Sequence, residues 1–357
     1  MSNLKVAIVG VGNSSSALIQ GCQFYKDASE EEFIPGLLHA NFGGYHVRDI
    51  KFVAAFDIDE RKVGADLGEA IFTEPNNTRV FAKVPKLGVK VAKGNQLDGL
   101  GKFQKKVVKA NPKDSVCDVS GILRETKADL LINYLPVGSD MATKWYAQKA
   151  LDADCAFVNC IPSFIASVPQ WQRKFEKAKL PVAGDDVMSQ VGATVIHKTL
   201  AKLLVDRGAL IEESYQLNVG GDTDFLNMLD EDRLVSKRVS KTSAVTALIP
   251  YKIPLKIGPS DYIPFLKNKK ICYIWCKGKY FGDTPFSIDL KLDVLDSPNS
   301  AGIVIDAIRA TKLAKDRGIK GPLTSISAYA FKHPPIQAPY GVAKTWVEEF
   351  IQGKRER

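Results

Sequence analysis

A chain of 357 residues with 45% hydrophobic and 25% charged side chains has the composition of an ordinary globular protein, and its length predicts two domains. It has no apolar run of about 18 residues and no basic N-terminal region followed by a cleavage site, so neither a membrane span nor a signal peptide is expected. The net charge of +9 comes from dispersed lysines without the aromatic motifs of RNA-binding domains. This argues against nucleic acid and favours an anionic small substrate.

The six cysteines are dispersed and give no complete set of metal ligands. Cys272 and Cys276 have the spacing nearest to a metal motif, but their apolar segment CYIWC is typical of a strand. Disulfide bonds are therefore not expected, and a reducing cytoplasm is the compartment that fits.

The chain opens on strand, Gly-rich turn and helix, the order that starts a Rossmann unit. After the strand LKVAIVG, the glycines of GVGNSSSALIQG let the backbone approach a pyrophosphate, and the helix N-terminus offers free N–H groups. Ser15 stands where the GxGxxG pattern has its third glycine, so the motif alone fits a plain tight turn equally well. The turn residues expected at a dinucleotide are Gly10, Gly12, Asn13 and Ser14.

A second apolar strand, FVAAFDIDERKVG, ends in acidic residues. Asp57 stands where an acidic side chain would hold the adenosine ribose hydroxyls. Its separation from Gly12 exceeds the usual spacing of about 20 residues, and an insertion over roughly residues 27–50 explains the excess.

Strands and helices continue to alternate to about residue 200, which predicts an α/β, doubly wound parallel sheet. Buried strands are expected at 128–139, 155–162 and 180–186, with a helix at 144–153. The lysine-rich segment KFQKKVVKANPK has the pattern of a solvated helix face.

Two adjacent acids, Asp185 and Asp186, follow the strand at 180–186 together with Ser189. We expect them at the start of a long helix, at the carboxyl edge of the sheet where cofactor and substrate meet. N-capping of that helix is an alternative role for the Asp pair.

From residue 210 the sequence becomes β-rich and alternating, which predicts an antiparallel sheet with one polar and one apolar face. Exposed sheets of this kind commonly form oligomer interfaces. A helix over 297–318 follows, with Ser297 or Asn299 as its cap and Gly318 as its stop, and then a terminal helix in VAKTWVEEFIQG.

This order predicts two units. Residues 1–200 and 297–357 would form a Rossmann-type domain, because the C-terminal helices can return to cover it. Residues 201–296 would form an α+β domain whose β-rich sheet serves catalysis and oligomerisation.

The segment 216–241, QLNVGGDTDFLNMLDEDRLVSKRVSK, concentrates amides, carboxylates, a Gly pair and lysines. We expect a loop from Asn218 to Asn227, because Gly and Asn adopt backbone shapes that other residues resist. A helix over SKRVSK would place Lys237 and Lys241 on one face, about 5–6 Å apart at Cβ. Repulsion and burial would then lower their pKa values toward neutral pH, where a lysine can do acid–base work. A solvated basic helix end is the alternative.

The chain contains in order VAIVGVGN, PGLLHANFGGYHVRD, VKFVAAFDID, NYLPVGS, AFVNCIPSFIAS, GDDVMSQVGAT, LNVGGDTDFLNM, SKRVSK, IGPSDY, DSPNSAG and AKDRG. In these fragments and their order it resembles the inositol-3-phosphate synthase (myo-inositol-1-phosphate synthase) family, in its short prokaryotic form. The resemblance implies conversion of D-glucose 6-phosphate to 1D-myo-inositol 3-phosphate, with NAD consumed and regenerated in one turnover. The family reaction oxidises C5, removes a C6 proton, closes the ring by an aldol step and reduces the C5 ketone.

The resemblance also implies site residues. Lys237 and Lys241 would serve the hydride and enolisation steps, with Lys269 and Lys332 near the developing oxyanion and the phosphate; Lys270 is a close rival of Lys269. Further matches to family catalytic residues are Asp186, Asp296 and Asn218. The matches for NAD are Gly10, Gly12, Asn13, Ser14, Asp57, Asp66, Thr126, Tyr146, Asp185, Ser189, Asp224 and Lys237.

One position departs from the family pattern, because Met188 stands where GDDxKSQ has lysine. Harmless loss of a surface lysine, or an altered substrate, would each explain it. A divalent metal ion is a second candidate cofactor for the aldol step, although the sequence shows no closed ligand set.

Three functions compete on these grounds. The synthase would turn over without net NADH, an NAD-dependent dehydrogenase of an anionic sugar would release NADH stoichiometrically, and an NAD-sensing scaffold would bind NAD without turnover. The clustered lysines argue against the scaffold, since it has no reason to keep repelling charges together. The family and the β-rich sheet both suggest a homotetramer, with no nucleic-acid or membrane partner.

Overall fold

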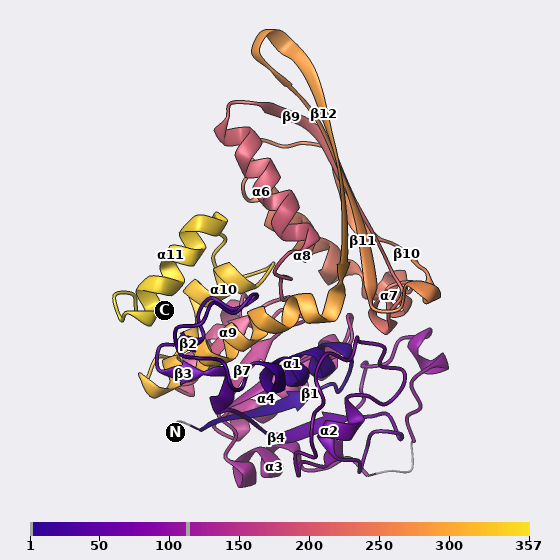
Figure 1. Ribbon diagram of the computed structural model, residues 1–357, viewed down its shortest axis with the longest axis vertical. Helices are drawn as coiled ribbons and strands as arrows, with labels where there is room; N and C mark the ends of the chain where they lie inside the picture. The colour runs from indigo at the N-terminus through magenta and orange to yellow at the C-terminus, as the bar shows by residue number, and fades with distance from the viewer. Residues whose placement is uncertain (1–2, 112–114) are drawn as a thin grey trace.

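The computed structural model of the chain describes residues 3–111 and 115–357, which form two main sheets and the helices packed around them (Figure 1). Within these residues the larger sheet has seven strands in the order β13-β8-β7-β6-β1-β4-β5, and each adjacent pair is parallel. This confirms the doubly wound sheet. Its strands are β1 (Leu4–Val9), β4 (Ile50–Asp57), β5 (Val91–Lys93), β6 (Leu130–Asn133), β7 (Ala156–Asn159), β8 (Pro181–Gly184) and β13 (Gly321–Pro322).

Side chains that alternate along β1 define the two buried faces of this sheet. Leu4, Val6 and Ile8 pack into one hydrophobic core, and Ala7 and Val9 pack into the other. Helices α1 (Asn13–Phe24), α9 (Asp296–Asp316), α10 (Thr324–Ala330) and α11 (Tyr340–Ile351) contribute to the first core. Helices α3 (Val119–Thr126), α4 (Asp140–Asp152) and α5 (Pro169–Lys177) contribute to the second.

The C-terminal helices therefore do cover the first sheet, and α9 also anchors the insertion at 27–50. The buried guanidinium of Arg309 donates to Ala40 O at 2.8 Å and pairs with Asp306. Asp306 in turn accepts from Leu38 N at 2.9 Å. The insertion contains a short antiparallel pair, β2 (Asn41–Phe42) and β3 (Tyr45–His46), followed by the turn η1 (Val47–Asp49).

The second sheet, within residues 210–295, has four strands in the order β10-β9-β11-β12. They are β9 (Leu210–Gly220), β10 (Leu255–Tyr262), β11 (Lys269–Tyr280) and β12 (Thr284–Leu295), and β11 and β12 extend far from the larger sheet (Figure 1). The expectation of a wholly antiparallel sheet is wrong, because β9 and β10 are parallel. In the sequence, the helices α7 (Thr223–Asn227) and α8 (Val235–Thr246) stand between β9 and β10, and they supply the crossover connection that a parallel pair requires.

Several local expectations are also corrected. The loop expected from Asn218 to Asn227 is confined to Gly221 and Asp222, because Asn218 and Gly220 belong to β9 and Asp224 and Asn227 to α7. The cap of α9 is Leu295, without a side-chain hydrogen bond, so neither Ser297 nor Asn299 caps it. Gly318 does end this helix, with φ of +68°.

The boundary expected at residue 200 falls inside α6 (Ala193–Asp206), whose Ala201 packs into the core of the second sheet. In the described part of the segment KFQKKVVKANPK, helical structure is confined to the 3-10 turn η2 (Gln104–Lys106), and residues 112–113 lie outside the described residues. The short helix α2 (Leu67–Ala70) precedes β5. Within the described residues, no helix has the length and apolarity that crossing a membrane requires.

Candidate active site

Two adjoining cavities lie where the carboxyl ends of β1, β4 and β6 face the second sheet. The first is lined by the start of α1 and by lysines from three other segments, and the second by the ends of β1 and β4. They form one elongated cleft, because both are lined by Gly12, Gln104, Tyr134, Leu135, Pro136 and Thr223.

The Gly-rich turn has the geometry of a dinucleotide site. Gly10 has φ of +90°, and a Cβ there would lie 2.5 Å from Tyr134 O, so a side chain is excluded. A Cβ on Gly12 would meet no atom within 4 Å, so this backbone borders the open cleft that a diphosphate would fill. Asn13 and Ser14, at the first turn of α1, also line the first cavity.

The second cavity has the features of an adenosine site. Asp57 ends β4 beside the turn, and its Oδ2 accepts from Val11 N at 2.6 Å. Tyr146 of α4 lines the same cavity, and its hydroxyl accepts from Asn95 N at 2.8 Å. The residues present thus fit a dinucleotide, with the carboxylate placed to accept from ribose hydroxyls.

Three of the expected cofactor residues line neither cavity. Asp66 caps α2, accepting from Gly68 N at 2.8 Å, and Thr126 ends α3, donating to Ile122 O at 2.8 Å. Asp185 is fully buried, and its carboxylate accepts from the side chain of Asn159 and from backbone N–H groups that include Ala166 N. These three side chains therefore hold the surrounding structure in place.

Asp186 projects into the first cavity and not toward a helix terminus. The helix α6 begins at Ala193 with Gly192 as its cap, so the N-capping alternative is wrong for both acids. The Asp186 carboxylate accepts from Lys332 Nζ at 2.9 Å and lies 3.4 Å from Lys237 Nζ. Its second oxygen accepts from Ser240 Oγ at 2.6 Å.

Four lysines from distant segments converge on this cavity. The helix over SKRVSK is confirmed as part of α8, and it presents Lys237 and Lys241 on one face. β11 contributes Lys270, and the segment after α10 contributes Lys332. The Lys237 and Lys332 side chains are 12% exposed, so the alternative of a solvated basic helix end is wrong.

The direction of the pKa shift divides these lysines into two pairs. Burial alone would lower the pKa of Lys237 and of Lys270, but nearby carboxylates raise both above the ordinary lysine value. Burial lowers the pKa of Lys332 to about 8, despite its contact with Asp186. Burial and the three neighbouring ammonium groups hold the pKa of Lys241 well below the ordinary value. For Asp186 the desolvation is outweighed by Lys237 and Lys332, which lower its pKa.

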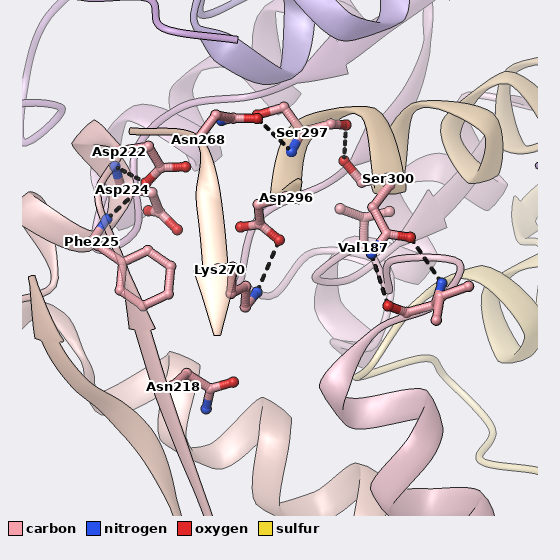
Figure 2. A network of polar contacts seen from close by, with 12 residues as sticks. Val187, Asn218, Asp222, Asp224, Phe225, Asn268, Lys270, Asp296, Ser297 and Ser300 are labelled. Atoms are coloured by element: carbon pink, nitrogen blue, oxygen red, sulfur yellow. Dashed lines mark hydrogen bonds and ion pairs between the residues drawn. The ribbon is translucent and has the colours of Figure 1, made fainter. Parts of the chain in front are cut away.

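The structure places Lys270, and not Lys269, in the cavity. Successive side chains of a strand point to opposite faces, and the Lys270 ammonium donates to Asp296 Oδ1 at 3.0 Å (Figure 2). The side chain of Lys269 is 45% exposed and pairs with Asp293 at 2.8 Å on the opposite face of the sheet. The assignment of Lys269 is therefore corrected to its neighbour.

Two further carboxylates that line the cavity come from α7 and its cap. Asp224 lines the cavity, as does Asp222, which the sequence analysis missed (Figure 2). Ser189 lines the same cavity. Asp222 caps α7 by accepting from Asp224 N at 3.0 Å. Burial, together with the carboxylates of Asp296 and Asp224, raises the pKa of Asp222 to about 7. Its position before a short helix was the sequence signal that could have identified it.

Asn218 and Met188 lie beside the cavity without lining it. Asn218 is buried in β9 near Lys270 (Figure 2). Its amide donates to Gly258 O at 2.8 Å. Met188 is 2% exposed, so the position that departs from the family pattern is not on the surface. The explanation that a surface lysine was lost is therefore wrong.

A parallel sheet in Rossmann order, a cleft shaped for a dinucleotide and a buried cluster of lysines define a Rossmann-type dinucleotide-binding enzyme. Residues 192–297 match the family model Myo-inositol-1-phosphate synthase. The chain is 52% identical to the inositol-3-phosphate synthase of Mycolicibacterium smegmatis and 50% identical to that of Corynebacterium glutamicum, in each case over 98% of both chains. It belongs to the inositol-3-phosphate synthase family.

The fold agrees with solved structures. A myo-inositol-1-phosphate synthase-related protein from Thermotoga maritima superposes with a TM-score of 0.80 at 23% identity, over 99% of this chain and all of the other. Inositol-3-phosphate synthase from Caenorhabditis elegans superposes with a TM-score of 0.74 at 15% identity, over 98% of this chain and 85% of the other. At these identities the likeness concerns the fold alone.

Proposed function

We propose that the protein is an inositol-3-phosphate synthase that converts D-glucose 6-phosphate to 1D-myo-inositol 3-phosphate, with NAD as its cofactor. The observation that carries the proposal is the meeting of four buried lysines at one end of a dinucleotide cleft. A simple dehydrogenase needs one acid–base group, whereas this reaction develops negative charge on oxygen at several steps. The relatives of that name, which match the chain along nearly its whole length, support the same assignment.

When bound, NAD would accept a hydride from C5 of the open-chain sugar and return it after ring closure. Lys237 and Lys270 have raised pKa values and remain ammonium groups at neutral pH. We assign to them the binding of the phosphate and of the developing oxyanion. Lys241 and Lys332 have lowered pKa values, so each gives up its proton more readily than an ordinary lysine. We assign to them the proton transfers at the C5 hydroxyl and at C6, so Lys237 and Lys332 exchange the roles that the family resemblance implied.

Asp186 is proposed to hold two of these lysines in register. Its carboxylate contacts both Lys332 and Lys237, which come from segments far apart in sequence. Asp296 does the same for Lys270 from the start of α9. Fixed ammonium groups need no reorganisation as charge develops, which is the main source of electrostatic catalysis.

The test is an incubation with D-glucose 6-phosphate and substoichiometric NAD, followed by phosphorus NMR. The synthase gives inositol phosphate in excess over NAD, without net NADH. NADH that rises in step with an oxidised sugar would establish the dehydrogenase instead, and NAD binding without turnover would establish the scaffold. Lys332→Ala should abolish product formation, whereas Lys320→Ala, at an exposed position, should not.

We also propose a homotetramer in which the outer face of the second sheet is buried between copies. This face carries Leu217 and Tyr273, which are exposed, and Tyr215 stacked on Trp275 at 5.4 Å. Apolar side chains gathered on an uncovered sheet favour association. Size-exclusion chromatography with light scattering would test it.

The proposed compartment is a reducing cytoplasm. All six cysteines lie in the described residues and carry free thiols, which supports this assignment. Within the described residues no group of three His, Cys, Asp or Glu side chains is arranged to hold a metal ion, so we assign no metal ligands.

A further inference from the structure

Gln104 occupies an unusual position at the point where the two cavities join. It lines both of them, yet the residue is only 4% exposed. Its side-chain Oε1 is buried and has no hydrogen-bond partner among the residues that the structure describes. A buried amide oxygen without a donor is rare in native proteins and calls for an explanation.

The main-chain carbonyl of Gln104 is hydrogen-bonded, so it is the side-chain oxygen of this residue that lacks a donor. Gln104 O accepts from Val107 N at 2.9 Å and from Val108 N at 2.8 Å. Two buried amides at the carboxyl edge of the larger sheet have partners: Asn133 donates to Asn159 Oδ1 at 2.9 Å, and Asn159 donates to Asp185 Oδ1 at 2.7 Å. Among the described residues, Tyr134 Oη and Asn227 Oδ1 are also buried without a partner. Tyr134 lines both cavities as Gln104 does, but its hydroxyl can donate as well as accept, whereas Gln104 Oε1 can only accept.

We propose that Gln104 is a cofactor-binding residue whose Oε1 accepts a hydrogen bond from a ribose hydroxyl of the dinucleotide. A carbonyl oxygen can only accept, so it suits a hydroxyl group and not a phosphate oxygen. The junction of the two cavities is also where a dinucleotide that spans the cleft must pass. This inference rests on the proposed use of NAD and adds a residue that neither the Gly-rich turn nor the lysine cluster contains.

The test compares Gln104→Leu with the wild-type protein by calorimetric titration of NAD in the absence of sugar. Loss of one hydrogen bond to a buried acceptor should weaken NAD binding about tenfold. Leucine also removes the unsatisfied oxygen, so the melting temperature of the NAD-free variant should be equal or higher. If Gln104 only stabilised the fold, Gln104→Leu would instead lower the melting temperature of the NAD-free protein. Gln170→Leu, at an exposed position on α5, is the matched control and should leave NAD binding unchanged.

NAD analogues that lack one ribose hydroxyl complete a double-mutant cycle. With one of these analogues the wild-type protein should lose about tenfold in affinity, and Gln104→Leu should lose little more. Wild-type affinity of Gln104→Leu for NAD would overturn the proposal, as would a change confined to the KM of the sugar phosphate. Failure of the wild-type protein to bind NAD would overturn both this inference and the proposed function, so the two failures can be told apart.

Discussion

Replacement of Asp186 by asparagine tests whether one carboxylate holds the lysine cluster together. The side chain is fully buried and contacts Lys332 at 2.9 Å and Lys237 at 3.4 Å. Asparagine keeps the shape but removes the charge, which leaves buried ammonium groups uncompensated. Breaking a buried ion pair in this way costs about 3–5 kcal/mol. That is a large part of the roughly 5–15 kcal/mol by which a typical domain is stable.

The assay is urea unfolding at pH 7 and at fixed protein concentration. Asp293→Asn is the matched control, because Asp293 forms an ion pair of similar length with Lys269 but is 40% exposed. An exposed pair contributes about 0–1 kcal/mol, so this control should scarcely move the midpoint. A loss below about 1 kcal/mol in Asp186→Asn would refute the view that this carboxylate compensates buried charge.

The pH dependence of the same variant gives a second check. The pKa of Lys332 is already lowered to about 8 by burial, and loss of Asp186 should lower it further. A lysine with a lowered pKa binds fewer protons in the folded than in the unfolded state. Its destabilising contribution to the free energy of unfolding therefore diminishes as the pH rises toward the pKa of lysine in the unfolded chain. The destabilisation of Asp186→Asn should therefore shrink from pH 7 to pH 9. A difference that is constant over this range would contradict the assignment to charge.

Three further predictions follow from the site. Lys270→Ala should lower kcat/KM about 100- to 1,000-fold, whereas Lys269→Ala should leave it within about twofold, as measured by product formation. Asp222→Asn should stabilise the protein at pH 8 but not at pH 4. The pKa of Asp222 in the folded state is raised to about 7, so the carboxylate is ionised at pH 8 at a cost to the folded state, and asparagine removes that cost. Urea midpoints at both pH values test this. Arg233→Ala should destabilise the protein by about 2 kcal/mol in urea and raise the KM for NAD, because its guanidinium donates at 2.9 Å to Val137 O and to Asp98 O beside the cleft.

Periodic and local features of the fold could be predicted from the sequence. The apolar runs gave the parallel strands, and the four-residue spacing of Lys237 and Lys241 gave their shared helix face. The parallel pairing of β9 and β10 was not predictable in this way, since both strands alternate as antiparallel ones do. It depends on the crossover through α7 and α8, which is a matter of topology and not of local pattern.

The choice between Lys269 and Lys270 shows why the site was harder to predict than the fold. A shift of one residue moves a side chain to the other face of a strand. The face that packs against α6 carries Cys272 and Ile274, but the opposite face carries Tyr273, which is also apolar enough to be buried. Both faces of β11 therefore look like core faces in the sequence, and only the packed structure separates them.

The difference between lysines with raised and lysines with lowered pKa values depends on contacts between segments that are far apart in the sequence. Asp186 follows β8 and Asp296 begins α9, yet each lies beside an ammonium group from another part of the chain. Among the described residues no ion pair joins Lys241 to a carboxylate, so burial and its ammonium neighbours dominate its pKa. The same helix thus carries one lysine that stays charged and one that can lose its proton. Spacing along α8 sets where these two lysines lie, whereas burial and charged groups from other segments set which of them keeps its proton.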